Sequence, residues 1–113
     1  GHNPPLFFQC KTKETSKLTR TGIFLGFDRN AIFHEKSIDL EPGDLIVFYT
    51  DGVLDAYNQQ DEEYGMERFE ALVNQNCDKS ASGILAIILD EIHKFIGDIP
   101  QYDDLTLLTI RRN

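Results

Sequence analysis

The chain has 113 residues, which suits one domain or part of one, and its hydrophobic fraction of 41% is enough for a packed core. A net charge of -8 and a pI near 4.7 argue against nucleic-acid binding, because phosphate-binding surfaces need clustered Lys and Arg. The sequence contains no apolar run of the roughly 20 residues that cross a bilayer.

The start of the chain, Gly1-His2-Asn3-Pro4-Pro5, has neither the charge nor the apolar stretch of a signal peptide. Cys10 and Cys77 have neither a metal-type spacing nor the density of a disulfide framework, so reduced thiols are expected. These features predict a cytoplasmic protein in which this segment makes no membrane contact.

The first part of the chain is predicted to be extended. Pro4-Pro5 excludes helix and leads into a strand over residues 6–11, which a polar loop over residues 12–22 follows. Glycines frame the apolar segment 22–27, which suits either a short strand or a tight turn.

Two further strands are predicted around a turn. Residues 31–40 read as a half-exposed strand, and Glu41-Pro42-Gly43-Asp44 has the Pro and Gly positions of a type II turn. The continuous apolar run over residues 45–49 predicts a central strand that is buried on both faces. The simplest topology is a hairpin between the 31–40 and 45–49 strands.

The second half of the chain has helical periodicity. Apolar residues from Met66 to Val73 recur at three- and four-residue spacing, which predicts an amphipathic helix. A second helix is predicted to begin at a Ser80 or Ser82 cap and to end at Gly97. Its buried stripe consists of Ile84, Leu85, Ile88, Leu89, Ile92, Phe95 and Ile96.

A last strand is predicted over residues 105–111. The order of strands and helices favours an α+β fold with an antiparallel sheet over a doubly wound sheet. The last strand would insert most easily beside an earlier central strand, which would bring Asp103 close to Asp51.

Two acidic segments, Thr50-Asp51-Gly52-Val53 and Asp103-Asp104-Leu105-Thr106, lie at the ends of strand-like runs. Mg²⁺ and Mn²⁺ prefer hard oxygen ligands, and a strand end holds a carboxylate rigidly. Asp51 and Asp103 are therefore predicted metal ligands in a metal-dependent hydrolase. The simpler alternatives are a helix cap for Asp51 and a solvated residue before the strand for Asp103.

Four other residues near these aspartates are candidates for supporting roles. Gly52 and Asp104 are predicted to shape the site without binding metal. Asp55 either approaches the metal or stabilises the first turn of a helix through the helix dipole. His2 either contacts substrate or has a structural role.

Six motifs occur in order along the whole chain and resemble the SpoIIE/RsbU-like branch of the PPM (type 2C) serine/threonine protein phosphatases. They are Gly1-His2-Asn3-Pro4-Pro5-Leu6, Thr21-Gly22-Ile23-Phe24-Leu25-Gly26, Leu40-Glu41-Pro42-Gly43-Asp44-Leu45, Tyr49-Thr50-Asp51-Gly52-Val53, Tyr64-Gly65-Met66-Glu67-Arg68-Phe69 and Asp103-Asp104-Leu105-Thr106-Leu107-Leu108.

The resemblance implies part of an α/β/β/α sandwich of antiparallel sheets flanked by helices. It also implies two Mn²⁺ or Mg²⁺ ions, with Asp51 and Asp103 as ligands, that activate water to hydrolyse phosphoserine or phosphothreonine. The implied substrate is a phosphorylated STAS-domain protein in a bacterial partner-switching pathway that regulates a sigma factor. An upstream regulatory or sensor domain is a further implied partner.

The sequence departs from the family pattern in one respect, because an earlier Asp-Gly motif that supplies the metal-bridging aspartate is not among its residues. Residues 1–113 are therefore expected to be the C-terminal portion of one phosphatase domain. Alone, this portion is expected to be inactive, with exposed sheet edges that favour homo-oligomers. The alternatives are a non-catalytic interaction module on the same fold and an unrelated small α+β binding domain.

Overall fold

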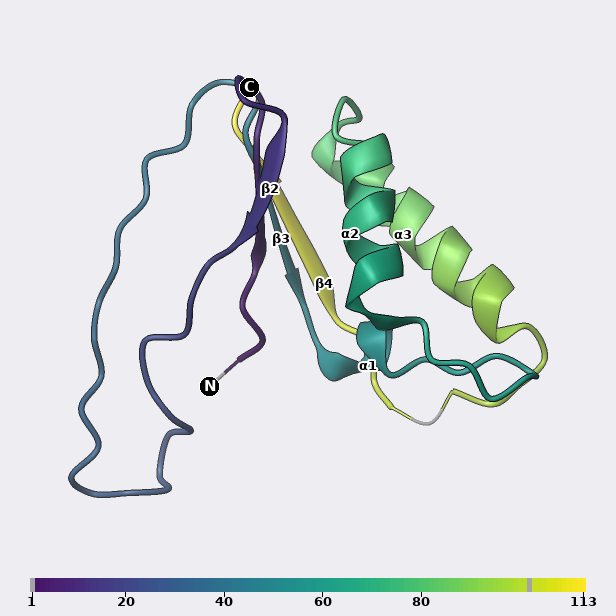
Figure 1. Cartoon of the computed structure of the whole chain (residues 1–113), viewed down its shortest axis with the longest axis horizontal. Coiled ribbons are helices and arrows are strands. Elements are labelled where there is room, and N and C mark those ends of the chain that lie inside the picture. The colour runs from purple at the N-terminus through teal and green to yellow at the C-terminus, as the bar shows by residue number, and fades with distance from the viewer. Residues whose placement is uncertain (1, 102) are drawn as a thin grey trace.

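The computed structural model describes residues 2–101 and 103–113. Its strands form one antiparallel sheet in the order β2-β1-β3-β4, which confirms the α+β class (Figure 1). In chain order the elements are β1 (Leu6–Gln9), β2 (Glu14–Lys17), β3 (Leu45–Tyr49), α1 (Asp51–Leu54), α2 (Gly65–Gln75), α3 (Ala81–Ile96) and β4 (Leu107–Arg111).

Strand β3 is central, as its apolar run predicts, with β1 on one side and β4 on the other. The prediction that it is buried on both faces is wrong at Phe48, which is 38% exposed because the helices cover only the other face. The predicted insertion of the last strand beside a central strand is confirmed, since β4 pairs with β3 from Leu45↔Arg111 to Tyr49↔Leu107. The turn before β3 is also confirmed. Gly43 has a φ of 92°, and the amide of Asp44 donates to the carbonyl of Glu41 at 3.0 Å.

The predicted strand over residues 31–40 is wrong, and so is its hairpin with residues 45–49. In the described structure residues 31–40 form an irregular loop, in which Ile32 is 74% exposed. The place beside β3 is taken by β1, through the pairs from Leu6↔Val47 to Phe8↔Leu45. Without a neighbour that satisfies its backbone groups, an apolar segment does not form a strand.

The predicted loop over residues 12–22 contains an edge strand instead. β2 pairs with β1 in register from Leu6↔Lys17 to Gln9↔Glu14, across a turn in which Lys13 has a positive φ of 59°. Hydrophobic periodicity did not indicate this strand, because its side chains are polar. Charged residues are common on an edge strand because they oppose pairing with a second chain.

Both predicted amphipathic helices are confirmed as α2 and α3. Ser80 caps α3, because its hydroxyl accepts from the amide of Gly83 at 3.0 Å, and Gly97 follows the last turn with a φ of 64°. The fully buried residues of α3 recur every four positions and pack against the sheet and α2. The core comprises Leu6, Phe8, Leu45, Val47, Tyr49, Val53, Ala56, Tyr64, Phe69, Val73, Ile84, Ile88, Ile92 and Ile96.

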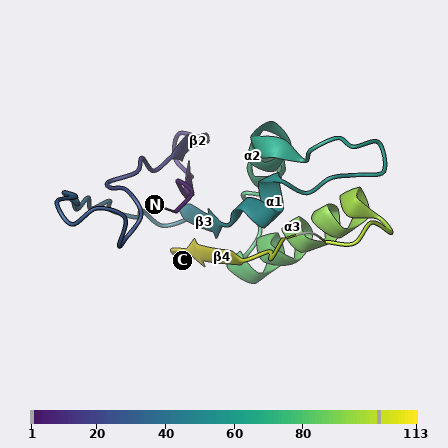
Figure 2. The ribbon, with the colours of Figure 1, turned by 90° about the horizontal axis from the view of Figure 1, so that it is seen from below.

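The helices and the long loop over residues 18–44 lie on opposite sides of the sheet (Figures 1 and 2). On the side away from the helices, Phe48, Leu108 and Ile110 are 38%, 54% and 42% exposed. The described residues therefore form one sheet with a helical layer on one face, which is half of the layered sandwich that the family resemblance implies.

Cys10 and Cys77 are both free thiols, as expected. Among the helices in the described part of the chain, none is long and apolar enough to cross a membrane.

Candidate metal centre

Thr50 joins the two acidic segments beyond the last residue pair of β3 and β4. Its amide donates to the carbonyl of Thr106 at 3.1 Å, and its hydroxyl accepts from the Thr106 amide at 3.0 Å. The same hydroxyl lies 3.3 Å from the carbonyl oxygen of Asp104, to which it donates. These contacts extend the ladder between the strands by one residue and place the Asp51 and Asp103 segments side by side, as the topology predicted.

Asp51 is the first residue of α1, and its side chain is exposed. Its Oδ1 accepts a hydrogen bond from the Asn3 side-chain amide at 2.7 Å. The helix-cap alternative for Asp51 is wrong, because Thr50 occupies the N-cap position. The Asp51 carboxylate is thus held by a residue outside its own helix.

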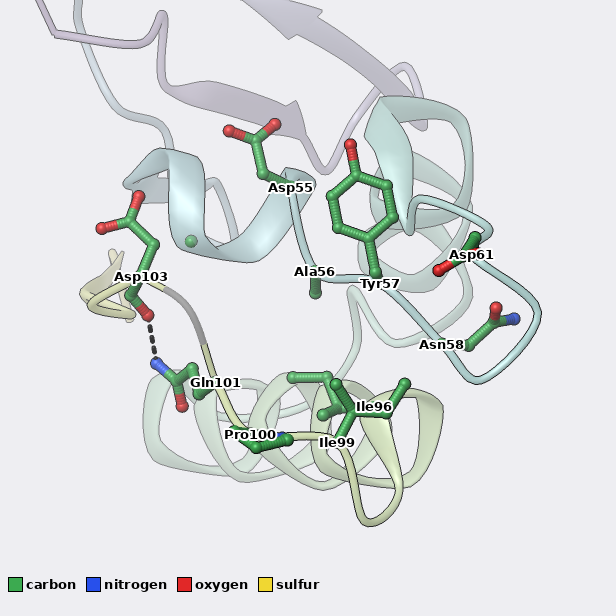
Figure 3. A pocket seen from close by; sticks show the side chains of 11 residues that line it. Asp55, Ala56, Tyr57, Asn58, Asp61, Ile96, Ile99, Pro100, Gln101 and Asp103 are labelled. Atoms are coloured by element: carbon green, nitrogen blue, oxygen red, sulfur yellow. Dashed lines mark hydrogen bonds between the residues drawn. The ribbon is translucent and has the colours of Figure 1, made fainter.

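Asp103 is also exposed and precedes β4 by four residues. Its Oδ1 accepts from the amide of Asp104 at 2.8 Å, and its carbonyl accepts from the side chain of Gln101 (Figure 3). The carbonyl of Asp104 accepts a hydrogen bond from the Thr50 hydroxyl and packs against Gly52. These contacts bring Gly52 and Asp104 together, and their supporting roles at a metal site stay a prediction.

A cleft of about 790 Å³ opens beside Asp103 and is lined by the α1–α2 loop and the end of α3. In Figure 3, Asp55 and Asp103 lie on the α1 side of this cleft, while Ile96, Ile99 and Pro100 form the opposite side. The cleft is mainly apolar with a carboxylate rim.

Asp55 does not stabilise the first turn of α1, because it is the residue that ends this helix. Its amide donates to the carbonyl of Asp51 at 2.8 Å. A hydrogen bond between the carboxyl groups of Asp55 and Glu63 raises the pKa of Glu63, because a shared proton relieves the repulsion of two like charges. The Asp55 carboxyl group therefore lies near that of Glu63.

His2 is exposed and lies at the edge of a second hollow, between the N-terminal segment and residues 18–25. Neither of its two predicted roles is supported by a contact within the described structure.

The donors at the site suit a hard divalent cation. Asp51 and Asp103 are exposed carboxylates on backbone segments that are locked together, and neither forms a salt bridge among the described residues. Oxygen ligands of this kind bind Mg²⁺ and Mn²⁺. Residues 2–101 and 103–113 contain no group of three or more His, Cys, Asp or Glu side chains that would hold a metal. Within these ranges, Asp51 and Asp103 do not belong to a complete metal-binding cluster.

Two residues of the site were not singled out by sequence reasoning, although both lie in the quoted motifs. Asn3 contacts Asp51, and Thr50 ties the strand ends together. The signal that would have found Asn3 is the register of β1 and β3. Because Leu6 pairs with Val47, the pairing continued by three residues sets Asn3 opposite Thr50.

The family described as Stage II sporulation protein E (SpoIIE) matches residues 1–113, the full length of the chain. The chain belongs to the SpoIIE family. This confirms the resemblance that the six motifs indicated, to a SpoIIE/RsbU-like part of a PPM-type domain.

Two proteins are similar to this chain over nearly its whole length. The chain is 32% identical over 113 residues to Protein IcfG of Synechocystis sp. (strain ATCC 27184 / PCC 6803 / Kazusa), with 100% of the chain and 18% of IcfG covered. It is 29% identical over 114 residues to phosphoserine phosphatase RsbU of Bacillus subtilis (strain 168), with 99% of the chain and 33% of RsbU covered. The chain therefore spans a third or less of these relatives.

The fold is similar to that of the SiaA-PP2C domain of Pseudomonas aeruginosa, with a TM-score of 0.79 and 20% sequence identity. All of the chain and 44% of the SiaA structure are covered. At this identity the likeness concerns the fold, and it places the SpoIIE-family chain in the PP2C architecture.

Proposed function

We propose that this chain supplies part of the active site of a metal-dependent protein phosphatase that hydrolyses phosphoserine or phosphothreonine. The observation that carries the proposal is the convergence of the Asp51 and Asp103 segments through the hydrogen bonds of Thr50. Membership of the SpoIIE family and the similarity to RsbU, which is a phosphoserine phosphatase, support this chemistry.

Asp51 and Asp103 are the residues that would hold Mn²⁺ or Mg²⁺, of which the complete site would bind two ions. When bound, such ions lower the pKa of a coordinated water and neutralise charge on phosphoryl oxygens. The chain's own contribution is to fix two carboxylates on rigid backbone. It does so because Thr50 and Thr106 continue the β3–β4 ladder up to the ligands.

The remaining ligands would come from an N-terminal portion of the same domain, and residues 1–113 would be its C-terminal portion. The exposed apolar side chains Phe48, Leu108 and Ile110 on the outer face of the sheet support this proposal, because such a face normally packs against another layer. Alone, the chain would bind metal weakly and be inactive, and its exposed sheet would favour homo-oligomers.

The proposed substrate is a phosphorylated STAS-domain protein, and an upstream sensor domain would regulate the activity. The relation to RsbU supports a phosphoserine substrate. The cleft beside Asp103, with apolar walls and a carboxylate rim, supports a substrate that reaches the site as a protein segment. A cytoplasmic location and a role in sigma-factor regulation are parts of the same proposal.

The test compares Mn²⁺-dependent dephosphorylation of a phosphoserine STAS protein by this chain and by an extended form that includes the upstream part of the domain. Asp103→Asn in the extended form is the key variant, and Asp39→Asn, an exposed aspartate of the 18–44 loop, is its matched control. We expect turnover only in the extended form, lost in Asp103→Asn and kept in Asp39→Asn. Turnover by neither form would favour the non-catalytic interaction module, and full activity of Asp103→Asn would contradict the ligand assignment.

A further inference from the structure

We infer that Asn3 is a positioning residue, which orients the Asp51 carboxylate for cation binding through the hydrogen bond between its side-chain amide and Asp51 Oδ1. The inference rests on the proposed function, in which Asp51 is a metal ligand. The bond is 2.7 Å long and joins residues 48 positions apart in the sequence.

The backbone around Asn3 explains how its amide reaches Asp51. Continuing the β1–β3 register beyond the Leu6↔Val47 pair brings Asn3 beside the end of β3. Pro4 and Pro5 restrict the φ angles between Asn3 and the strand, so the segment has few alternative conformations. The carbonyl of Pro5 accepts from the Leu18 amide at 2.9 Å, which anchors the segment further.

The chemistry of an amide suits this position better than that of a charged side chain. A Lys or Arg at the same place would neutralise Asp51 and compete with a cation, whereas the Asn3 amide carries no net charge. Its N–H group occupies Oδ1 and fixes the side-chain torsions of Asp51, while Oδ2 keeps its lone pairs for a metal. Groups that orient a metal ligand typically account for about 10–100-fold in metal affinity.

The first measurement needs no metal. In the extended form of the protein, the side-chain amide of Asn3 should show slowed hydrogen exchange by ¹⁵N NMR, and Asp51→Ala should abolish this protection. An Asn3 amide that exchanges freely in the unsubstituted protein would overturn the inference.

The second measurement is Mn²⁺ binding by isothermal titration calorimetry, with phosphatase activity recorded at increasing Mn²⁺. Asn3→Ala should raise the Kd for Mn²⁺ by about tenfold, while saturating Mn²⁺ should restore most of kcat. Asn30→Ala is the matched control, because Asn30 is exposed in the 18–44 loop, and it should leave the Kd unchanged.

A purely structural role of Asn3 would lower the free energy of unfolding but leave the Kd of the folded protein for Mn²⁺ unchanged, and that result would overturn the inference. A kcat deficit that saturating Mn²⁺ does not restore would also overturn it. If the unsubstituted protein binds Mn²⁺ but hydrolyses no phosphoserine, the proposed function fails while the Kd comparison still decides the role of Asn3. If it binds no Mn²⁺, the inference is overturned as well.

Discussion

Gly52 and Asp104 are in such close contact that no side chain fits between them. An ideal Cβ on Gly52 would lie 2.2 Å from the carbonyl oxygen of Asp104 and 2.9 Å from its carbonyl carbon. Gly52 is the second residue of α1 and lies just beyond Thr50, whose hydrogen bonds to Thr106 and Asp104 extend the β3–β4 ladder. A glycine directly after Asp51 is thus what lets the two acidic segments approach.

The first prediction concerns this contact. Gly52→Ala should push the Asp103–Asp104 segment away from α1 and lower the free energy of unfolding by about 2 kcal/mol, because backbone atoms cannot yield as a flexible side chain can. Urea denaturation measures the change. Gly83→Ala in α3 is the control, since its new methyl would meet side-chain atoms alone, the Ser80 hydroxyl at 3.0 Å and the Lys79 Cβ at 3.5 Å. Equal losses in the two variants would contradict the importance of the Gly52 contact.

The sequence predicted the elements whose own residues decide their structure. The four-residue spacing of buried isoleucines specifies α3, and Pro42 and Gly43 specify the turn before β3, so both were found from sequence alone. The strand over residues 31–40 was predicted wrongly, because its apolar content is compatible with a strand but pairing depends on what lies beside β3. β1 pairs there instead, and its residues lie 37 to 41 positions away from their partners in β3 along the chain.

The candidate site was also predicted only in part. Asp51 and Asp103 were predicted because each follows or precedes a recognisable strand, and the position of the last strand brings them together. Asn3 was not predicted as a contact, because its hydrogen bond to Asp51 depends on the exact register of β1 against β3. Hydrophobic patterns fix which face of a strand is buried but leave such a register open.

The second prediction concerns Asp44, which is a buried acidic residue at 2% exposure. Its Oδ1 accepts from the amide of Cys10, and its Oδ2 accepts from the amide of Glu41, each at 2.9 Å. Asp44→Ala would leave both donors without this partner and should lower the free energy of unfolding by about 2–3 kcal/mol. Asp39→Ala, at an exposed position, is the control in the same denaturation experiment. A loss below that of the control would rule out a structural role for this carboxylate.

The third prediction concerns the hydroxyl of Tyr49, which is buried and has no hydrogen-bond partner within the described structure. Its ring packs edge-on against Phe69 with centroids 4.9 Å apart. Tyr49→Phe keeps this packing and removes a buried polar atom, so the free energy of unfolding should rise by about 1 kcal/mol. Thermal denaturation gives the measurement, and Tyr57→Phe at an exposed site serves as control. A less stable Tyr49→Phe variant would indicate that the hydroxyl has a partner.

The fourth prediction tests which serine caps α3. The Ser80 hydroxyl accepts from the Gly83 amide, whereas Ser82 lies within the first turn. Ser80→Ala should therefore cost about 1 kcal/mol of stability, and Ser82→Ala should cost less, because alanine favours the helix interior. Matched urea titrations of the two variants decide between the positions, and a larger loss for Ser82→Ala would reverse the assignment.

The fifth prediction is a dependence of stability on alkaline pH. Tyr64 is buried at 3% exposure, and its burial, with a smaller contribution from Glu91, raises the pKa of its phenol from 10.0 to about 12. Between these values the unfolded chain has released this proton and the folded chain still holds it. The unfolded state then binds fewer protons, so the free energy of unfolding falls as pH rises from 10 to 12. Below pH 10 both states are protonated, and Tyr64 contributes no pH dependence.

Urea midpoints measured at several values between pH 8 and pH 12 test this effect. Lysine titration contributes to the loss of stability at alkaline pH in every variant. The informative quantity is therefore the slope of the urea midpoint against pH, compared between the unsubstituted protein and Tyr64→Phe. The slope should be shallower in Tyr64→Phe above pH 10 and equal to that of the unsubstituted protein below it. Identical slopes above pH 10 would show that the Tyr64 phenol ionises as readily in the folded chain as in the unfolded one.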